Sequence, residues 1–259
     1  MKLKQLSALC LAASVLATAP AMAWESADGQ HSTSASVALS TEYVWRGVTR
    51  SDEKPAISGS FDYGHASGFY AGTWASSTDG FIDADTSLEL RTYGGYASEV
   101  GDSGIGYDLG MMRYMYPGSD GSGWNEGYVT LSYSHFSASV KHTTDVLSTG
   151  ESATHYSLGF NYGLPMDIDF SAGIATWDFN DVDDTFQKLT GSTAAMTTAA
   201  NLPSSGEDYA ISLSKEVFGF GMTLSYIDSL SDGEELATFA TGDSGASDNR
   251  VVFSISKSL

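Results

Sequence analysis

The sequence has one cysteine, few basic residues and no long apolar run beyond its N-terminal region. Its 259 residues contain 12 Lys and Arg against 32 Asp and Glu, a formal net charge of −20. Nucleic-acid binding requires clustered basic side chains that face phosphates, so this charge balance excludes it. Apolar residues make up 42% of the chain and aromatic residues 12%, which is too much for a disordered acidic polymer. The sequence therefore predicts a folded chain.

The N-terminus has the three parts of a secretory signal peptide. Lys2 and Lys4 precede an apolar stretch over residues 6–15, and Ala21-Met22-Ala23 forms a small-x-small cleavage site. We expect cleavage after residue 23, which would also remove Cys10 and exclude disulfides and thiol chemistry. A membrane anchor is the weaker alternative because the apolar stretch is short. No later segment has the roughly 18 successive apolar residues of a spanning helix, so a β-barrel is the remaining membrane architecture.

Apolar and polar residues alternate with period two through most of the chain. Val37 and Leu39, for example, alternate with Ser36, Ala38 and Ser40. In an extended strand this pattern places one side-chain type on each face. We expect about twelve strands, at residues 34–48, 55–65, 68–77, 82–96, 104–116, 125–134, 136–143, 154–162, 166–177, 208–217, 219–228 and 250–259.

The expected connections alternate between tight turns and longer loops, of which 178–207 and 229–249 are the longest. Outer-membrane barrels have this asymmetry, with short periplasmic turns, longer external loops and an even number of strands. The sequence thus predicts an all-β fold: a transmembrane, antiparallel, up-and-down β-barrel over residues 34–259, after a short periplasmic segment at 24–33. A soluble periplasmic β-sandwich lectin is the alternative.

Aromatic residues also follow barrel geometry, because amphipathic rings suit the two membrane interfaces. Tracing the strands up and down predicts an inner rim of Tyr63, Phe69, Tyr96, Tyr107, Tyr133, Tyr162 and Phe220, and an outer rim of Tyr43, Trp45, Tyr156, Tyr209 and Tyr226.

Several sequence blocks resemble one known family. They are Ser40-Thr41-Glu42-Tyr43-Val44-Trp45-Arg46-Gly47, Lys54-Pro55-Ala56-Ile57-Ser58-Gly59, Ser67-Gly68-Phe69-Tyr70-Ala71-Gly72-Thr73-Trp74 and Glu89-Leu90-Arg91-Thr92-Tyr93-Gly94-Gly95-Tyr96. From about residue 34 to its end the chain resembles the TorF-type family of outer-membrane porins. The resemblance implies a pore in the outer membrane of a Gram-negative bacterium and supplies no catalytic or binding residues. The chain departs from the pattern of such barrels by ending in Leu259 rather than Phe.

Charged residues within the strands are candidates to line a lumen, because one facing lipid costs ~2–4 kcal/mol at the bilayer midplane. A constriction with an acidic majority would favour cations, whereas internal ion pairs that plug the barrel are an equal alternative. Arg113 shares the parity of Leu109 and Met111, so it requires either a bulge or a side chain that snorkels to the interface. The pore-lining candidates are Glu42, Arg46, Asp62, Asp85, Glu89, Arg91, Asp108 and Lys141.

The two longest loops are acidic, and two interpretations follow. They form a solvated surface, which we favour, or they hold Ca²⁺ between the protein and lipopolysaccharide. Residues 178–184 fit a calcium loop poorly because Val182 stands where an oxygen ligand is needed. The five histidines form no metal-binding or catalytic motif, so we expect no metal, no cofactor and no enzyme. The expected partners are membrane lipid, lipopolysaccharide and small solutes or ions. A non-conducting structural or adhesive barrel that acts through these loops is the alternative function.

Overall fold

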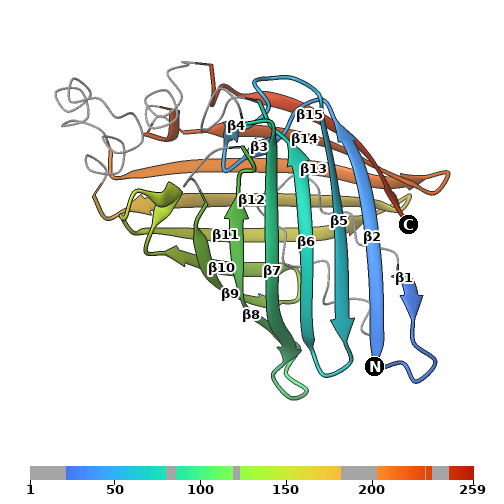
Figure 1. Cartoon of the computed structure of the whole chain (residues 1–259). Coiled ribbons are helices and arrows are strands. Elements are labelled where there is room, and N and C mark those ends of the chain that lie inside the picture. Colours follow the sequence, from blue (N-terminus) through green and yellow to red (C-terminus); the bar gives the residue numbers. More distant parts are fainter. Residues whose placement is uncertain (1–21, 80–85, 119–122, 182–202, 231, 235–244) are drawn as a thin grey trace.

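The computed structural model describes residues 22–79, 86–118, 123–181, 203–230, 232–234 and 245–259, and it is a β-barrel (Figure 1). Twelve antiparallel strands form the closed ring, which confirms the predicted fold class. No helix in the described part of the chain is long and apolar enough to cross a membrane. The ring strands are β2 (His31–Ser40), β5 (Ala56–His65), β6 (Phe69–Ser77), β7 (Leu88–Glu99), β8 (Ile105–Met115), β9 (Asn125–Tyr133), β10 (Phe136–Thr143), β11 (Ala153–Leu164), β12 (Ile168–Phe179), β13 (Ser205–Val217), β14 (Phe220–Ser229) and β15 (Arg250–Ser258).

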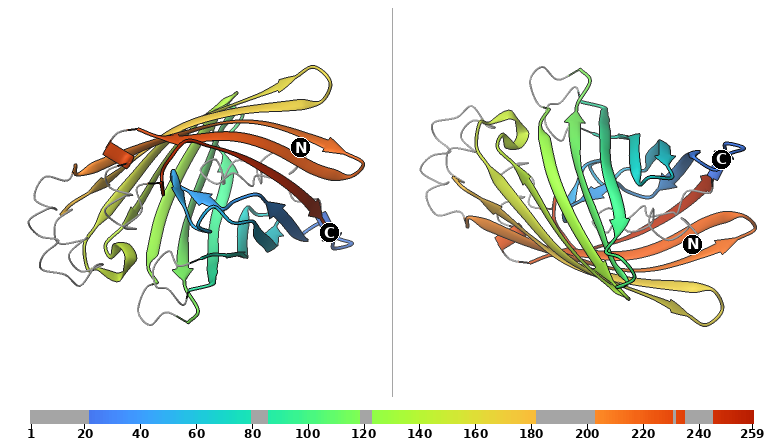
Figure 2. Two further views of the ribbon diagram at one scale, coloured as in Figure 1. Left: turned by 90° about the horizontal axis from the view of Figure 1, so that it is seen from above. Right: turned by 90° about the horizontal axis from the view of Figure 1, so that it is seen from below.

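The ring closes because β2 pairs along both of its edges (Figure 2). One edge pairs with β5 over the whole of His31–Ser40. The other edge pairs with β15 over Ser36–Ser40 and, further along, with the short strand β1 (Met22–Glu25). Closure gives every ring strand two neighbours, so backbone groups are satisfied without water, as a hydrocarbon environment requires.

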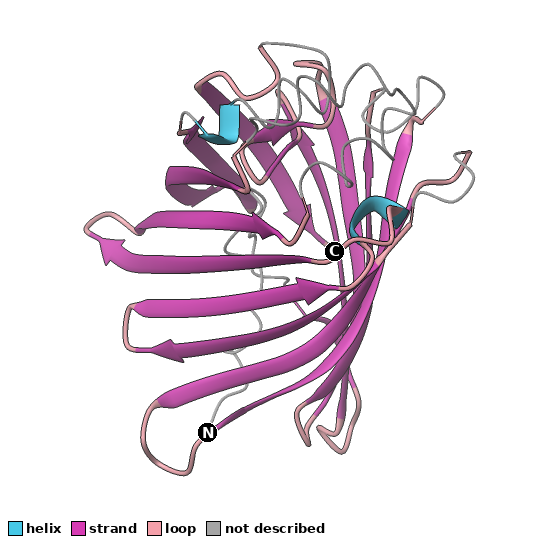
Figure 3. Cartoon of the chain, turned by 90° about the vertical axis from the view of Figure 1, so that its left-hand side faces the viewer, coloured by secondary structure: helices cyan, strands magenta, loops and turns pink. Residues whose placement is uncertain are grey.

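The connections sort by length to opposite ends of the barrel (Figure 3). Tight turns follow β5, β7, β9, β11 and β13, at what we call the short-turn end. Longer connections follow β2, β6, β8, β10, β12 and β14, at the long-loop end. The predicted alternation is confirmed. Both β1 and the end of β15 lie at the short-turn end, since β2 begins there and pairs with both.

The barrel wall is apolar outside and polar inside. Large apolar side chains on the outer face are exposed, among them Leu158 (62%) and Val251 (63%), whereas the inward-facing Ser225 and Glu89 are fully buried. A water-soluble sandwich would bury its apolar face, so this arrangement fits a hydrocarbon surround. Outward aromatics lie near both ends, and Phe69 packs edge-to-face on Tyr96 at 5.0 Å between ring centroids.

The strand prediction was wrong in one place that matters for the interior. Strand β2 ends at Ser40 instead of continuing to residue 48, so Tyr43 and Trp45 do not belong to an outer rim; both are buried inside the barrel. The physical reason for this error is that the alternation of apolar and polar residues continues past Ser40 as far as Gly47. Period two alone therefore does not reveal that the strand ends before the hairpin turn at Arg46 and Gly47. Of the two alternatives predicted for Arg113, the structure fits the exposed side chain and not the bulge, because β8 pairs in continuous register with β7 and β9 and this side chain is exposed near the long-loop end.

Candidate functional site: the barrel interior

Residues 41–55, which connect β2 to β5, form an inward segment that contains a small hairpin. Its strands β3 (Val44–Trp45) and β4 (Val48–Thr49) pair across a two-residue turn. Arg46 and Gly47 at the turn have φ of 52° and 77°. Two successive left-handed residues define the tight hairpin turn that matches strand twist, and glycine at the second position is favoured for this reason. A Cβ on Gly47 would also lie 2.9 Å from that of Asp208, so space requires glycine too.

This segment crosses the interior of the barrel. It joins neighbouring strands, yet Arg46 binds Glu126 on β9 and Trp45 contacts Trp177 on β12. The carbonyl of Gly47 accepts a hydrogen bond from Ser229 on β14 (3.3 Å). A connection between β2 and β5 can touch β9, β12 and β14 together only by lying inside the ring.

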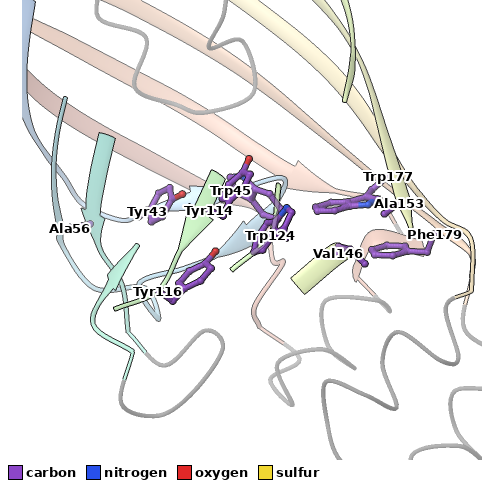
Figure 4. Packing of buried hydrophobic residues seen from close by; sticks show 10 residues of the cluster. All are labelled: Tyr43, Trp45, Ala56, Tyr114, Tyr116, Trp124, Val146, Ala153, Trp177 and Phe179. Atoms are coloured by element: carbon purple, nitrogen blue, oxygen red, sulfur yellow. The ribbon is translucent and has the colours of Figure 1, made fainter. Parts of the chain in front are cut away.

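An aromatic cluster fixes the inward segment against the wall (Figure 4). Trp45 packs on Trp177 at 4.9 Å between ring centroids and on Trp124 at 6.2 Å. Trp124 in turn stacks on Tyr114 at 4.2 Å. The remaining buried members are Tyr43, Ala56, Tyr116, Val146, Ala153 and Phe179. The apolar side chains of the outer face are exposed. Among the described residues, this cluster is therefore the main group of apolar side chains that is buried.

A buried ion pair anchors the hairpin tip. The Arg46 guanidinium donates to both carboxylate oxygens of Glu126, at 2.7 and 2.9 Å, and both side chains are almost fully buried. The same guanidinium lies over the rings of Trp45 (4.2 Å) and Trp177 (4.0 Å). The planar guanidinium of arginine can make two parallel hydrogen bonds to one carboxylate and stack on aromatic rings at the same time. A lysine ammonium group cannot do both.

A second buried network lies where the segment begins. Glu89 pairs with Arg91 at 2.6 Å from Nε, and it accepts hydrogen bonds from Tyr43 (3.0 Å) and Tyr116 (2.9 Å). Arg91 also donates to the hydroxyl of Tyr43 and lies 4.5 Å from the ring centre of Trp74. Burial raises the pKa of Tyr43 above its ordinary value, so this hydroxyl stays neutral and serves both partners.

The candidate residues fall into two groups. Glu42, Arg46, Glu89 and Arg91 gather at the long-loop end in buried ion pairs, Glu42 with Arg250. Asp62 and Asp108 lie nearer the short-turn end and accept hydrogen bonds from Tyr93 and Tyr70. Lys141 on β10 pairs in register with Tyr128 and His155. Asp85 lies outside the described residues. A pore-lining role for these side chains stays a prediction.

Three tyrosines lie flat along the inner wall of β5–β9, each over a glycine of a neighbouring strand. Tyr93 pairs with Gly72 and reaches over it to donate to Asp62. A Cβ on Gly72 would lie 2.5 Å from the Tyr93 ring. The glycine is therefore what allows the ring to lie against the strand.

The other two tyrosines meet end to end. Tyr70 crosses Gly95 on β7, and Tyr128 crosses Gly110 on β8. Their hydroxyls bond to each other, and Tyr70 donates to Asp108 at 2.6 Å. Gly95 and Gly110 are paired with each other across β7 and β8. The two rings therefore lie over adjacent backbone positions that carry no side chain. We call Tyr70, Tyr93 and Tyr128 with their glycines the tyrosine wall.

Acidic residues share this half of the interior. The strand parity that directs Glu89 and Asp108 inward also directs Glu99 on β7, Asp169 on β12 and Glu216 on β13 inward, near the short-turn end. The last two side chains are exposed. The described interior therefore has ion-paired charges at the long-loop end and carboxylates with tyrosines at the short-turn end.

The sequence analysis missed the tyrosine wall, Glu126 and Arg50. Glu126 has the parity of the inward Tyr128 and Thr130, a signal that could have identified it. The repeated Tyr-x-Gly of β6 and β7 was a second available signal. Arg50 is fully buried, 4.1 Å from the ring centre of Trp45, and nothing in its local sequence marks it.

Within the described ranges, no three His, Cys, Asp or Glu side chains are grouped so that they could hold a metal ion. The sequence expectation for Ca²⁺ concerned 178–207 and 229–249, which lie largely outside those ranges.

These features define the class: a closed twelve-stranded β-barrel of the porin type, apolar outside and polar inside. The chain belongs to the family described as "Bacterial protein of unknown function (Gcw_chp)", whose match covers residues 24–259. The narrower resemblance to TorF-type porins stays a prediction. No curated protein matches the chain.

The fold has a counterpart among solved structures. The chain is similar to the NanC porin with a TM-score of 0.52 and 11% identity, covering 86% of this chain and 97% of that one. It is also similar to the KdgM porin, with a TM-score of 0.46 and 6% identity, over 88% and 98% of the two chains. At such identities the likeness concerns the fold alone.

Proposed function

We propose that this protein is a channel for small solutes in the outer membrane of a Gram-negative bacterium, exported with a signal peptide over residues 1–23. The observation that carries the proposal is a closed ring of twelve strands whose apolar face is outside and whose charged and hydroxyl side chains are inside. A protein with this polarity is stable only where lipid covers its outer face. The long-loop end then faces the exterior of the cell and the short-turn end the periplasm.

The inward segment is, in this proposal, the constriction of the channel. It occupies the long-loop end and is held by Arg46–Glu126, by Tyr43–Glu89 and by the aromatic cluster. Solutes would pass beside it or after its displacement, which makes residues 41–55 the element that sets the size limit.

We further propose that the channel favours cations. Three arginines of the interior, Arg46, Arg91 and Arg250, are matched at the long-loop end by Glu126, Glu89 and Glu42. Towards the short-turn end the inward charges include five carboxylates, Asp62, Glu99, Asp108, Asp169 and Glu216. Rings of Asp and Glu attract cations and repel anions in such pores.

Planar-bilayer recording of the purified protein tests both parts of the proposal. Stepwise conductance in KCl is the expected result, with a reversal potential in a KCl gradient that indicates K⁺ preference. Absence of steps would overturn the channel function, and a reversal potential of the opposite sign would overturn cation preference. The double variant Asp169→Asn/Glu216→Asn, which removes two exposed inward carboxylates, should reduce K⁺ preference and leave insertion unchanged.

A non-conducting barrel is the second candidate, and one observation favours it. Arg50, Glu89 and Trp124 are fully buried at the long-loop end, so this part of the interior is tightly filled. Such a protein would act through its loops 178–207 and 229–249. Deletion of these loops should then abolish partner binding while the barrel still inserts, whereas a channel would keep or increase its conductance.

A further inference from the structure

The tyrosine wall has a property that the ion-paired end of the barrel lacks. Tyr70, Tyr93 and Tyr128 point inward by strand parity, and each is partly exposed. One face of each ring is covered by the glycine beneath it, as the contacts of Gly72 and Gly95 with their tyrosines show. The exposed part is therefore the opposite face, which is directed to the interior.

An aromatic face turned to the interior attracts cations, because the ring quadrupole is negative above its plane. Two of these rings are made more electron-rich by their hydrogen bonds. Tyr93 donates its proton to Asp62 and Tyr70 donates to Asp108, and donation to a carboxylate polarises the phenol toward its anionic form. The carboxylates add direct attraction for a positive charge on the same surface.

Charges on the surrounding strands act in the same direction. Glu99 lies on β7 beyond Gly95. Among the described residues, two basic side chains adjoin the wall: Arg91, which shares the inward face of β7 with Tyr93 and is paired with Glu89, and Lys141, which pairs in register with Tyr128. On the inward face around the wall the carboxylates of Asp62, Glu99 and Asp108 therefore outnumber Lys141, and the wall keeps an acidic surrounding.

We propose that the tyrosine wall is a recognition track for organic cations, solutes that present an alkylammonium or guanidinium group. The inference rests on the proposed channel function and names its solute class. A track of ring faces binds a methylated or planar cation better than it binds hydrated K⁺, since both ring contact and charge contribute. Neutral solutes of similar size gain only the ring contact, and anionic solutes are repelled by the carboxylates.

Choline is the probe for the test, measured in two ways. In planar bilayers, choline added to one side should reduce the K⁺ current in a saturable manner. Calorimetric titration of the detergent-purified protein with choline should show the same saturation without requiring conductance. If KCl gives no steps but choline still binds, the channel proposal fails and the track stands. If KCl conducts and choline neither blocks nor binds, the track is overturned alone.

Variants assign the effect to the rings. Tyr93→Leu should weaken choline block and binding roughly 3- to 10-fold, given the strength of a partly desolvated cation–π contact. Tyr93→Phe keeps the ring and should retain most of the affinity, which guards against a loss caused by misfolding. Tyr133→Leu, an equal change on the exposed outer face, is the matched control. Equal choline affinity in Tyr93→Leu and wild type, or tighter binding of galacturonate than of choline, would overturn the proposal.

Discussion

Removal of the Glu126 charge should release the inward segment. In Glu126→Gln the Arg46 guanidinium stays buried but loses its anionic partner, with which it now makes two bonds of 2.7 and 2.9 Å. Removing one member of a buried pair costs ~3–5 kcal/mol, and the amide oxygen, which still accepts one bond, favours the lower figure. A cost of ~3 kcal/mol corresponds to about a 100-fold shift toward the displaced segment.

Trypsin cleavage measures this shift directly. Arg46 and Arg50 are buried in the folded barrel, so trypsin reaches them only when the segment leaves the interior. If opening is fast relative to cleavage, the cleavage rate follows the open population and should rise by the same factor in Glu126→Gln. The urea midpoint of the whole barrel should fall as well, because the folded state loses the same ~3 kcal/mol relative to the unfolded chain.

A control variant makes the outcome decisive. Glu53→Gln removes the same charge from an exposed position of the same segment and should leave cleavage at the wild-type rate. Our account of the anchor is refuted if Glu126→Gln is cleaved no faster than wild type, or if both variants are cleaved equally fast.

Three further predictions concern the effect of substitutions in the barrel strands on stability. Gly72→Ala should destabilise the barrel by ~1–3 kcal/mol in urea unfolding, because its Cβ would meet the ring of Tyr93 at 2.5 Å, whereas Gly127→Ala, with no atom within 4 Å, should be neutral. Leu158→Arg, on the outer face, should cost ~2–4 kcal/mol for folding into lipid vesicles, and an unchanged value would contradict the membrane-facing assignment. Glu89→Gln, at a fully buried position, should lower the midpoint of thermal unfolding, and a midpoint equal to that of wild type would show that its ion pair contributes nothing.

The barrel itself could be predicted from sequence because its rules are local. The side-chain period of two, seen at Val37 and Leu39, requires only that one face meets lipid and the other does not. The alternation of tight turns with long loops supplied the direction of the strands. Both signals are properties of single strands and their neighbours in sequence, so they do not depend on contacts across the ring.

The interior was predicted less well because its contacts are between distant strands. Trp45 alternates correctly for a membrane rim, yet the turn at Arg46–Gly47 directs it inward to Trp177, far away in sequence. Likewise, nothing local to Asp62 indicates that a tyrosine two strands away will bind it. Parity identifies which residues face inward, but only the register decides which of them meet.

The seam between the first and last ring strands differs from the others. β2 pairs with β5 from His31 to Ser40 but with β15 only from Ser36 to Ser40, and on that edge Trp24 and Glu25, which follow the proposed cleavage site, pair with Thr33 and Ser32. This junction is therefore the shorter of the two by which β2 joins its ring neighbours, and it cannot form until β15 is in place. Before β15 pairs with β2, the sheet has two edges with unpaired backbone groups, which are prone to pair with other chains. After this pairing it has none, so β15 converts an open sheet into a closed barrel.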